Sequence, residues 1–261
     1  MSHLEFEGQL LVTVDQAREV LGSSYDDIKD ILGSLVRKGW LVRLRRGLYQ
    51  VIPAAHGGYS ARDWFVLLQA FRTPYYLSFL SAAYILGLSP QRPWLAQVVT
   101  PKPVKGQYGS TEQGVQQVVL GEPRFFGFAE MEREGLTINI AEPAKAVVDC
   151  LYHVEKAGGI LEVARIVARG VREAPSGKLV EYAIRMKNRA LTHKLGYLTD
   201  TLGPGLAKTA RSRLLRYASS RQGHHSLLGS VKTFGTKGKY DRTWRITDNV
   251  GRERLLGELE F

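Results

Sequence analysis

The chain has 261 residues, of which 44% are hydrophobic and 23% charged, values typical of folded globular domains. Its start has no basic segment followed by an apolar one, and no apolar run reaches the roughly 18 residues of a membrane span, so neither a secretory signal nor membrane insertion is expected. The single cysteine, Cys150, excludes an intrachain disulfide and a cysteine-based zinc site, and its apolar neighbours predict a buried thiol. These features favour the cytoplasm.

The net charge of +11 predicts a polyanionic partner. That charge is unevenly distributed along the chain. Residues 1–55 hold seven basic and seven acidic residues, whereas residues 165–221 hold 13 basic and three acidic residues. The excess charge therefore lies far in sequence from the first 55 residues.

Two short amphipathic helices are predicted near the N-terminus. The first covers residues 13–21, where Thr13 and Gln16 have the spacing of a capping box and Gly22 is a natural stop. The second covers residues 25–38, with Ser24 as its N-cap and Gly39 at its end. Apolar residues are expected to form the core-facing side of the two helices: Val14, Ala17, Val20, Leu21, Ile28, Ile31, Leu32 and Leu35.

A β-hairpin is predicted directly after the second helix. Trp40, Val42 and Leu44 alternate with Leu41, Arg43 and Arg45, which is the period of a strand. The Arg46-Gly47 pair is expected to form the turn, and residues 48–52 form the returning strand before Pro53. The order of helix, turn, helix and basic hairpin is typical of a winged helix-turn-helix.

This arrangement predicts double-stranded DNA as the partner, because the second helix of such a module enters the major groove. Wing arginines would contact phosphates or a minor groove. The candidate DNA-binding residues are Ser24, Lys29, Ser34, Arg37, Lys38, Arg43, Arg45 and Arg46.

Two alternatives stay open for this segment. The wing arginines are also compatible with a solvated hairpin tip. Asp26, Asp27 and Asp30 would repel phosphates, so they are either capping residues, acceptors for cytosine amino groups, or signs of a module that contacts protein.

The remainder of the chain reads as a mixed domain, beginning after a small-residue stretch at 54–58. Helices are expected at 60–72, at 78–87 with Ser78 as the cap, at 142–154 and through most of 158–221. Strand character is expected at 95–100, 113–120, 124–131, 136–140, 230–235 and 243–248.

Four stretches resemble the AbiEi family of antitoxins from type IV toxin–antitoxin systems. They are GWLVRLRRGLY at 39–49, YLSFLSAAY at 76–84 followed by Gly87-Leu88, INIAEPAKAVVDCL at 138–151, and WRITDN at 244–249. The resemblance implies a winged-helix N-terminal domain, autorepression of a two-gene operon and a cognate toxin of the nucleotidyltransferase type. It does not imply a stable complex with that toxin. The chain departs from the family pattern at Ala144-Lys145, where an arginine is usual.

Catalytic signals are weak. Glu142 and Asp149 could share one face of a helix and serve acid–base chemistry or Mg²⁺ binding, but a dipole role for Glu142 and a hydrogen-bond role for Asp149 are the simpler interpretation. His224-His225 have poor geometry for one metal. The Gly/Lys loop at 235–239 lacks Walker spacing and reads as a basic hairpin turn. We therefore expect no catalytic residues, no metal and no cofactor.

A second basic surface is predicted around an amphipathic helix at 205–221. It would bind nucleic acid phosphates or an acidic partner, or be a solvated face. Its residues are Arg185, Lys187, Arg189, Lys208, Arg211, Arg213 and Arg216.

The sequence thus predicts an α+β protein with a winged helix-turn-helix at 1–55 and a larger, helix-rich α/β domain at 57–261. The predicted function is that of a DNA-binding antitoxin that represses its own operon by binding the operator upstream of its gene. One alternative is an antitoxin that sequesters a nucleotidyltransferase toxin through its basic C-terminal domain. The other is an enzyme that modifies nucleic acid.

Overall fold

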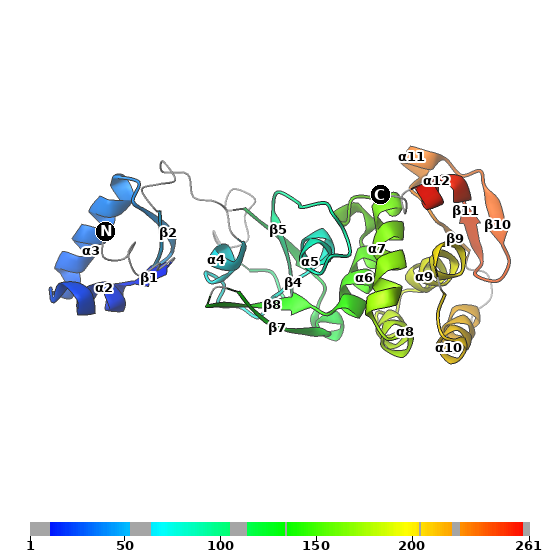
Figure 1. The fold of residues 1–261 in the computed structure, drawn as a ribbon, viewed down its shortest axis with the longest axis horizontal. Helices are drawn as coiled ribbons and strands as arrows, with labels where there is room; N and C mark the ends of the chain where they lie inside the picture. The colour runs from blue at the N-terminus through cyan, green and yellow to red at the C-terminus, as the bar shows by residue number, and fades with distance from the viewer. Residues whose placement is uncertain are drawn as a thin grey trace. The chain divides into compact units, whose positions relative to one another are not determined.

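A computed structural model describes residues 11–52, 64–104, 114–133, 135–203, 205–220 and 225–257 (Figure 1). The chain divides into two compact units. The first comprises Met1–Pro74, Val104–Val115 and Met131–Ile138, and the second comprises Tyr75–Pro103, Gln116–Glu130 and Asn139–Phe261. The predicted boundary at residues 55–57 and the small-residue stretch at 54–58 lie outside the described residues. Within the described ranges, no helix is both long and apolar enough to cross a membrane.

The N-terminal end of the first unit is a winged helix-turn-helix, as predicted. Two helices are followed by a hairpin, and a short strand before the helices completes an antiparallel sheet of order β1-β3-β2. The elements are β1 (Leu11–Thr13), α2 (Val14–Leu21), α3 (Tyr25–Arg37), β2 (Leu41–Arg45) and β3 (Leu48–Val51).

Local hydrogen bonds explain where the two helices start and stop. Thr13 and Gln16 form the predicted capping box, in which the Gln16 amide donates to Thr13 Oγ1 over 3.2 Å and Thr13 N donates to Gln16 Oε1 over 2.8 Å. Gly22 ends α2 in the left-handed region at φ 62°. Ser24 caps α3 by accepting from Asp27 N over 3.3 Å.

The core of this module is smaller than the apolar pattern predicts. Val14, Ala17, Ile28 and Leu32 are buried, and Leu35 packs against them. Three residues expected on the core side are instead exposed: Val20 at 52%, Leu21 at 51% and Ile31 at 38%. The apolar stripe of each helix is therefore wider than its buried side, which comprises only Val14 and Ala17 in α2 and Ile28 and Leu32 in α3.

The expected alternation along the wing strand is also interrupted. The register of β2 against β3 shifts between Arg43 and Arg45, which marks a bulge. Leu41 and Leu44 are therefore both buried although they are three residues apart. Leu44 packs with Leu48, Val66 and Ala70 in a second small core of this unit.

The helix predicted at 60–72 is shorter in the structure. It is α4 (Trp64–Leu68), which is followed by turns whose amides bond three residues back. Residues 60–63 lie outside the described part of the chain.

A five-stranded sheet of order β6-β5-β4-β8-β7 belongs mainly to the second unit. Its central strand β4 is antiparallel to β5 and parallel to β8. The strand predicted at 124–131 begins later, because residues 122–124 form a 3-10 helix, η4 (Glu122–Arg124). The strands are β4 (Tyr76–Leu77), β5 (Ala96–Thr100), β6 (Val115–Val119), β7 (Phe128–Arg133) and β8 (Leu136–Ala141).

Helices dominate the rest of the second unit (Figure 1). The central one is α6, which packs against α5, α7 and α8 and is buried along most of its length. The segment 158–221 is mostly helical, as predicted. The elements are α5 (Phe79–Ile85), α6 (Pro143–Tyr152), η5 (Val154–Lys156), α7 (Ile160–Glu173), α8 (Ser176–Arg185), α9 (Arg189–Leu202) and α10 (Lys208–Ser219).

Two predictions for the C-terminal segment are wrong. The strand expected at 230–235 is a helical turn, and the basic loop at 235–239 connects that turn to a strand instead of closing a hairpin. The hairpin turn lies between β10 and β11, at residues 242–245. The elements are β9 (Ser226–Leu227), α11 (Val231–Phe234), β10 (Lys239–Asp241), β11 (Ile246–Asp248) and α12 (Arg252–Gly257).

Candidate nucleic-acid interface

The predicted contact residues at the start of α3 are engaged in local interactions. Ser24 Oγ lies 2.6 Å from Asp27 Oδ2 as well as accepting from the Asp27 amide, so its hydroxyl acts as a helix cap. Lys29 Nζ pairs with Asp26 Oδ1 over 3.2 Å and lies over the Tyr25 ring. These contacts occupy the Ser24 hydroxyl and partly neutralise the Lys29 charge, so both groups are less available to DNA.

Carboxylates dominate the exposed surface of the first two turns of α3. Asp26, Asp27 and Asp30 are all exposed, and only Asp26 has an ion-pair partner within the described structure. This half of the helix therefore presents negative potential, which disfavours close approach to phosphates.

The C-terminal half of α3 and the wing have the opposite character. Arg37 and Lys38 are exposed where α3 ends, and Ser34 is half-buried. Arg43 and Arg46 are exposed on the hairpin. Within the described residues, neither Arg43 nor Arg46 forms an ion pair with a carboxylate, so both guanidinium groups are available to a ligand.

Arg45 differs from the other wing arginines. It is half-buried, its Nη1 donates to the Arg46 carbonyl over 3.4 Å, and its buried Nε has no hydrogen-bond partner in the described structure. Its guanidinium is thus partly turned into the wing, and the exposed charge of the hairpin comes mainly from Arg43 and Arg46.

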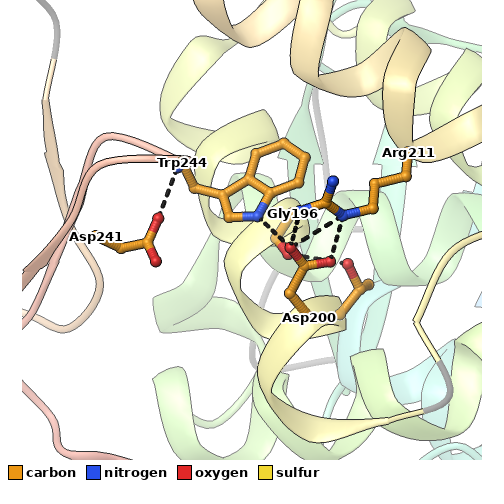
Figure 2. Close-up of polar contacts among 6 residues, drawn as sticks. Gly196, Asp200, Arg211, Asp241 and Trp244 are labelled. Atoms are coloured by element: carbon orange, nitrogen blue, oxygen red, sulfur yellow. Dashed lines mark hydrogen bonds and ion pairs between the residues drawn. The ribbon is translucent and has the colours of Figure 1, made fainter. Parts of the chain in front are cut away.

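The seven residues of the second basic surface do not all face solvent. Arg189 donates from Nη1 to the Tyr217 carbonyl over 2.8 Å and from Nη2 to Ser220 Oγ over 2.9 Å, and so caps the end of α10. Arg211 forms a bidentate pair with Asp200 of α9, at 2.9 Å and 2.6 Å (Figure 2). Both arginines hold helices together.

The remaining cations on α10 share one exposed face. Lys208, Arg213 and Arg216 are exposed, and the exposed residues between and beside them are Thr209, Ser212 and Ser219. The opposite face buries Ala210, Leu214 and Ala218, as predicted. No carboxylate occurs anywhere from 201 to 240, a stretch with eight lysines and arginines. This face therefore offers only cations and hydroxyls.

Arg185 and Lys187 lie at the end of α8. Arg185 is exposed and stacks over the Phe126 ring, with its Cζ 3.8 Å from the ring centroid. Lys187 is exposed and has a φ of 53° in the turn before α9. Their charges are available to a ligand.

Four residues of the motifs at 76–84 and 138–151 meet at one buried ion pair. Lys145 Nζ donates to Asp149 Oδ1, and both side chains are 0% exposed. Asp149 Oδ2 also accepts from Ser78 Oγ over 2.7 Å and Tyr76 Oη over 3.1 Å. Burial lowers the pKa of Lys145, and the carboxylate of Asp149 opposes that shift. Ser78 occupies the N-cap position of α5, as predicted, but its hydroxyl makes no capping hydrogen bond to that helix. The hydroxyl donates to Asp149 instead.

The possible catalytic pair of Glu142 and Asp149 does not form. Glu142 is the N-cap residue of α6 and accepts from Lys178 Nζ over 2.9 Å and Tyr182 Oη over 2.6 Å, whereas Asp149 is bound within the buried cluster around Lys145.

Cys150 is buried, as predicted, and burial raises the pKa of its thiol. Within the described ranges, no group of three histidine, cysteine or acidic residues could hold a metal ion. His224 lies outside those ranges.

Trp244 of the last motif joins the C-terminal sheet to the helices (Figure 2). Its Nε1 donates to Asp200 Oδ2 over 2.7 Å, and its amide donates to Asp241 Oδ1 over 2.7 Å. The indole lies against Gly196 of α9 so closely that a Cβ there would be 2.2 Å from Trp244 Cε3. The Asp200 carboxylate therefore accepts hydrogen bonds from both Trp244 and Arg211 and holds the two side chains in place.

This packing predicts that Gly196→Ala destabilises the protein by about 1–3 kcal/mol, because the added methyl has no space against the rigid indole. Gly177→Ala is the matched control. A Cβ on Gly177 meets nothing within 4 Å, so that change should be neutral or stabilise helix α8 by up to about 1 kcal/mol. Urea unfolding of both variants measures the difference, and equal stabilities would contradict the packing described.

Comparison with protein families tests the regulatory interpretation. Residues 4–52 match the family described as "Transcriptional regulator, AbiEi antitoxin". The N-terminal segment is thus similar to this family, and the match is confined to that segment. The match coincides with the winged helix-turn-helix and includes both α3 and the wing. The AbiEi family is regulatory, which agrees with the interpretation of the chain as a regulator.

A solved structure extends the fold comparison beyond residues 4–52. The crystal structure of the RV2827C protein from Mycobacterium tuberculosis aligns with a TM-score of 0.70, covering 100% of this chain and 93% of that one. At 15% identity this likeness concerns the fold alone. The mixed α+β architecture, with a winged helix followed by a larger domain, is therefore shared. The comparison with curated proteins found no match.

Proposed function

We propose that this protein is a DNA-binding antitoxin that represses its own operon by binding the operator upstream of its gene. The observation that carries the proposal is the AbiEi domain itself, whose wing exposes Arg43 and Arg46 without ion-pair partners in the described structure. The cognate toxin would be of the nucleotidyltransferase type, and it need not be bound directly.

The charge distribution supports a division of roles within the AbiEi domain. Arg37 and Lys38 at the end of α3, with Arg43 and Arg46 of the wing, would contact phosphates. Base contacts would come from Ser34 and neighbouring positions in the C-terminal half of α3, since acidic side chains occupy the first half. Any role for Asp26, Asp27 or Asp30 would be as acceptors from cytosine amino groups.

The exposed face of α10 would act as a second phosphate-binding surface. Its three cations and three hydroxyls can all donate hydrogen bonds to phosphate oxygens. The sequence from 201 to 240 contains no carboxylate that would compete for these donors. A sequence-independent contact of this kind would add affinity, and the AbiEi domain would supply specificity.

The decisive experiment is a mobility-shift titration of the full chain with the DNA upstream of its gene, beside a scrambled duplex of equal length. Preferential binding of the upstream DNA, measured at several salt concentrations, supports the proposal. Equal binding of both duplexes contradicts operator recognition. Co-purification with the product of the neighbouring gene would instead favour direct sequestration of a toxin, and nucleotide-transfer or nuclease activity would favour an enzyme.

The role of α10 makes a separate prediction. The triple variant Lys208→Ala, Arg213→Ala, Arg216→Ala should lower the slope of log affinity against log salt by about 2.7, since each duplex phosphate contact contributes about 0.9. Arg211→Ala removes one positive charge from the same helix but breaks the pair with Asp200. It should lower stability and leave the slope nearly unchanged. An unchanged slope in the triple variant removes the second surface from the proposal.

A further inference from the structure

The loop between α5 and β5 presents a tryptophan to solvent. The Trp94 side chain is 91% exposed, more than any other large hydrophobic residue in the described structure. A tryptophan side chain typically buries about 150–250 Å² when it packs, and tryptophan is enriched among residues that dominate protein interfaces. Its exposure points to a contact that an isolated chain does not make.

The loop that carries Trp94 is held in place on both sides. Ser89 Oγ donates to Glu162 Oε1 over 2.6 Å and accepts from Gln91 N over 3.0 Å. Pro90 and Pro93 restrict the backbone on the approach to Trp94. A side chain on such a preorganised loop binds a partner with little loss of conformational entropy.

A cavity of about 680 Å³ lies beside the base of this loop, within the same unit. Gly158 lines the cavity and also contacts the loop, since a Cβ on it would be 3.3 Å from Gln91 Oε1. Just past the loop, Gln97 Nε2 donates to the Lys156 carbonyl of η5 over 2.8 Å. The loop that carries Trp94 is therefore anchored, through Gln91 and the nearby Gln97, against the segment 156–158 that forms one wall of the cavity.

The walls of the cavity match the chemistry of an indole. Ile160, Leu228 and Phe234 provide apolar surface. Lys194 and Glu155 also line the cavity, and Glu155 Oε1 lies 2.9 Å from His153 Nδ1. An ammonium group can pack on the face of an indole, and a carboxylate can accept from its N–H. Burial lowers the pKa of Lys194, as expected of an amine held against apolar walls.

We infer that this face mediates self-association, with Trp94 of one copy inserted into the cavity of a second copy. Since the loop that carries Trp94 packs against a wall of the cavity, a two-fold axis would let each copy donate its Trp94 to the other in one closed contact. Two indoles and the walls they cover account for roughly 600–1,000 Å², below the about 1,200 Å² of a typical stable interface. The dimer is therefore weak and concentration-dependent.

Sedimentation velocity of the full chain, from low to high micromolar concentration and without DNA, tests this inference. The wild type should gain mass toward a dimer as concentration rises, and Trp94→Ala should stay monomeric. Thr233→Trp, which keeps Trp94 but narrows the cavity from α11, should also stay monomeric. Trp40→Ala is the matched control, because Trp40 is another exposed tryptophan and lies in the first unit, so its loss should leave association unchanged.

Two results would overturn the inference. They are a wild type that stays monomeric throughout and a Trp94→Ala variant that associates like the wild type. Since the experiment contains no DNA and no variant touches α3 or the wing arginines, its failure is distinct from a failure of operator binding.

Discussion

Replacing Arg43 and Arg46 together with alanine should weaken binding to the upstream DNA by roughly 100-fold at moderate salt. Both guanidinium groups are exposed on the wing and have no carboxylate partner in the described structure. A hydrogen bond to a charged group contributes about 1.5 kcal/mol, or roughly tenfold in affinity, for each arginine. The slope of log affinity against log salt should also fall by about 1.8. Fluorescence anisotropy at several salt concentrations measures both quantities.

A lysine double variant separates charge from geometry at the same two positions. If Arg43 and Arg46 contact phosphates as point charges, Arg43→Lys with Arg46→Lys keeps the salt slope and most of the affinity. If either arginine reads a base edge through two parallel hydrogen bonds, the lysine variant loses specificity as well. Wild-type affinity in the alanine variant would show that the wing does not contact DNA.

Removal of the buried carboxylate by Asp149→Ala should destabilise the protein by about 3–5 kcal/mol. The change leaves Lys145 as an uncompensated charge in a fully buried site and takes the acceptor from Tyr76 and Ser78. The expected loss is a large fraction of the 5–15 kcal/mol by which domains are usually stable. Urea unfolding of the full chain, followed by circular dichroism, provides the measurement.

Two further variants show whether the effect comes from burial. Lys102→Ala breaks the exposed pair with Glu122, whose atoms are 3.7 Å apart, and should cost no more than about 1 kcal/mol. The double variant Lys145→Met, Asp149→Leu removes both buried charges and should recover part of the stability lost in Asp149→Ala. A loss below about 1 kcal/mol in Asp149→Ala would contradict the role assigned to this cluster.

The winged helix-turn-helix was predictable because its signals are local. Thr13, Gln16, Ser24 and Gly22 act on backbone groups within four residues, and these caps appear where the sequence places them. The order of helix, helix and hairpin follows from periodicity within each segment. The match of residues 4–52 to the AbiEi antitoxin family agrees with that interpretation.

The predictions that failed relied on the spacing of apolar residues alone, which does not show which other elements pack against a segment. An apolar residue is buried only if a neighbouring element covers it, and Val20, Leu21 and Ile31 stay exposed in the structure. The bulge in β2 depends on its register against β3, which the periodicity within β2 alone cannot show. The segment 230–235 has only Val231 and Phe234 as apolar residues, and so short a pattern is compatible with either a strand or a helical turn.

The sequence by itself determined the type and order of the N-terminal elements, the total charge and its concentration in residues 165–221. Only the tertiary structure decided which charges are available. Arg211 and Asp200 are 11 residues apart, Arg189 and Tyr217 are 28 apart, and Tyr76 and Asp149 are 73 apart. Whether a charged side chain is paired or free depends on the groups that packing places beside it, and in these three cases the partner is distant in the sequence.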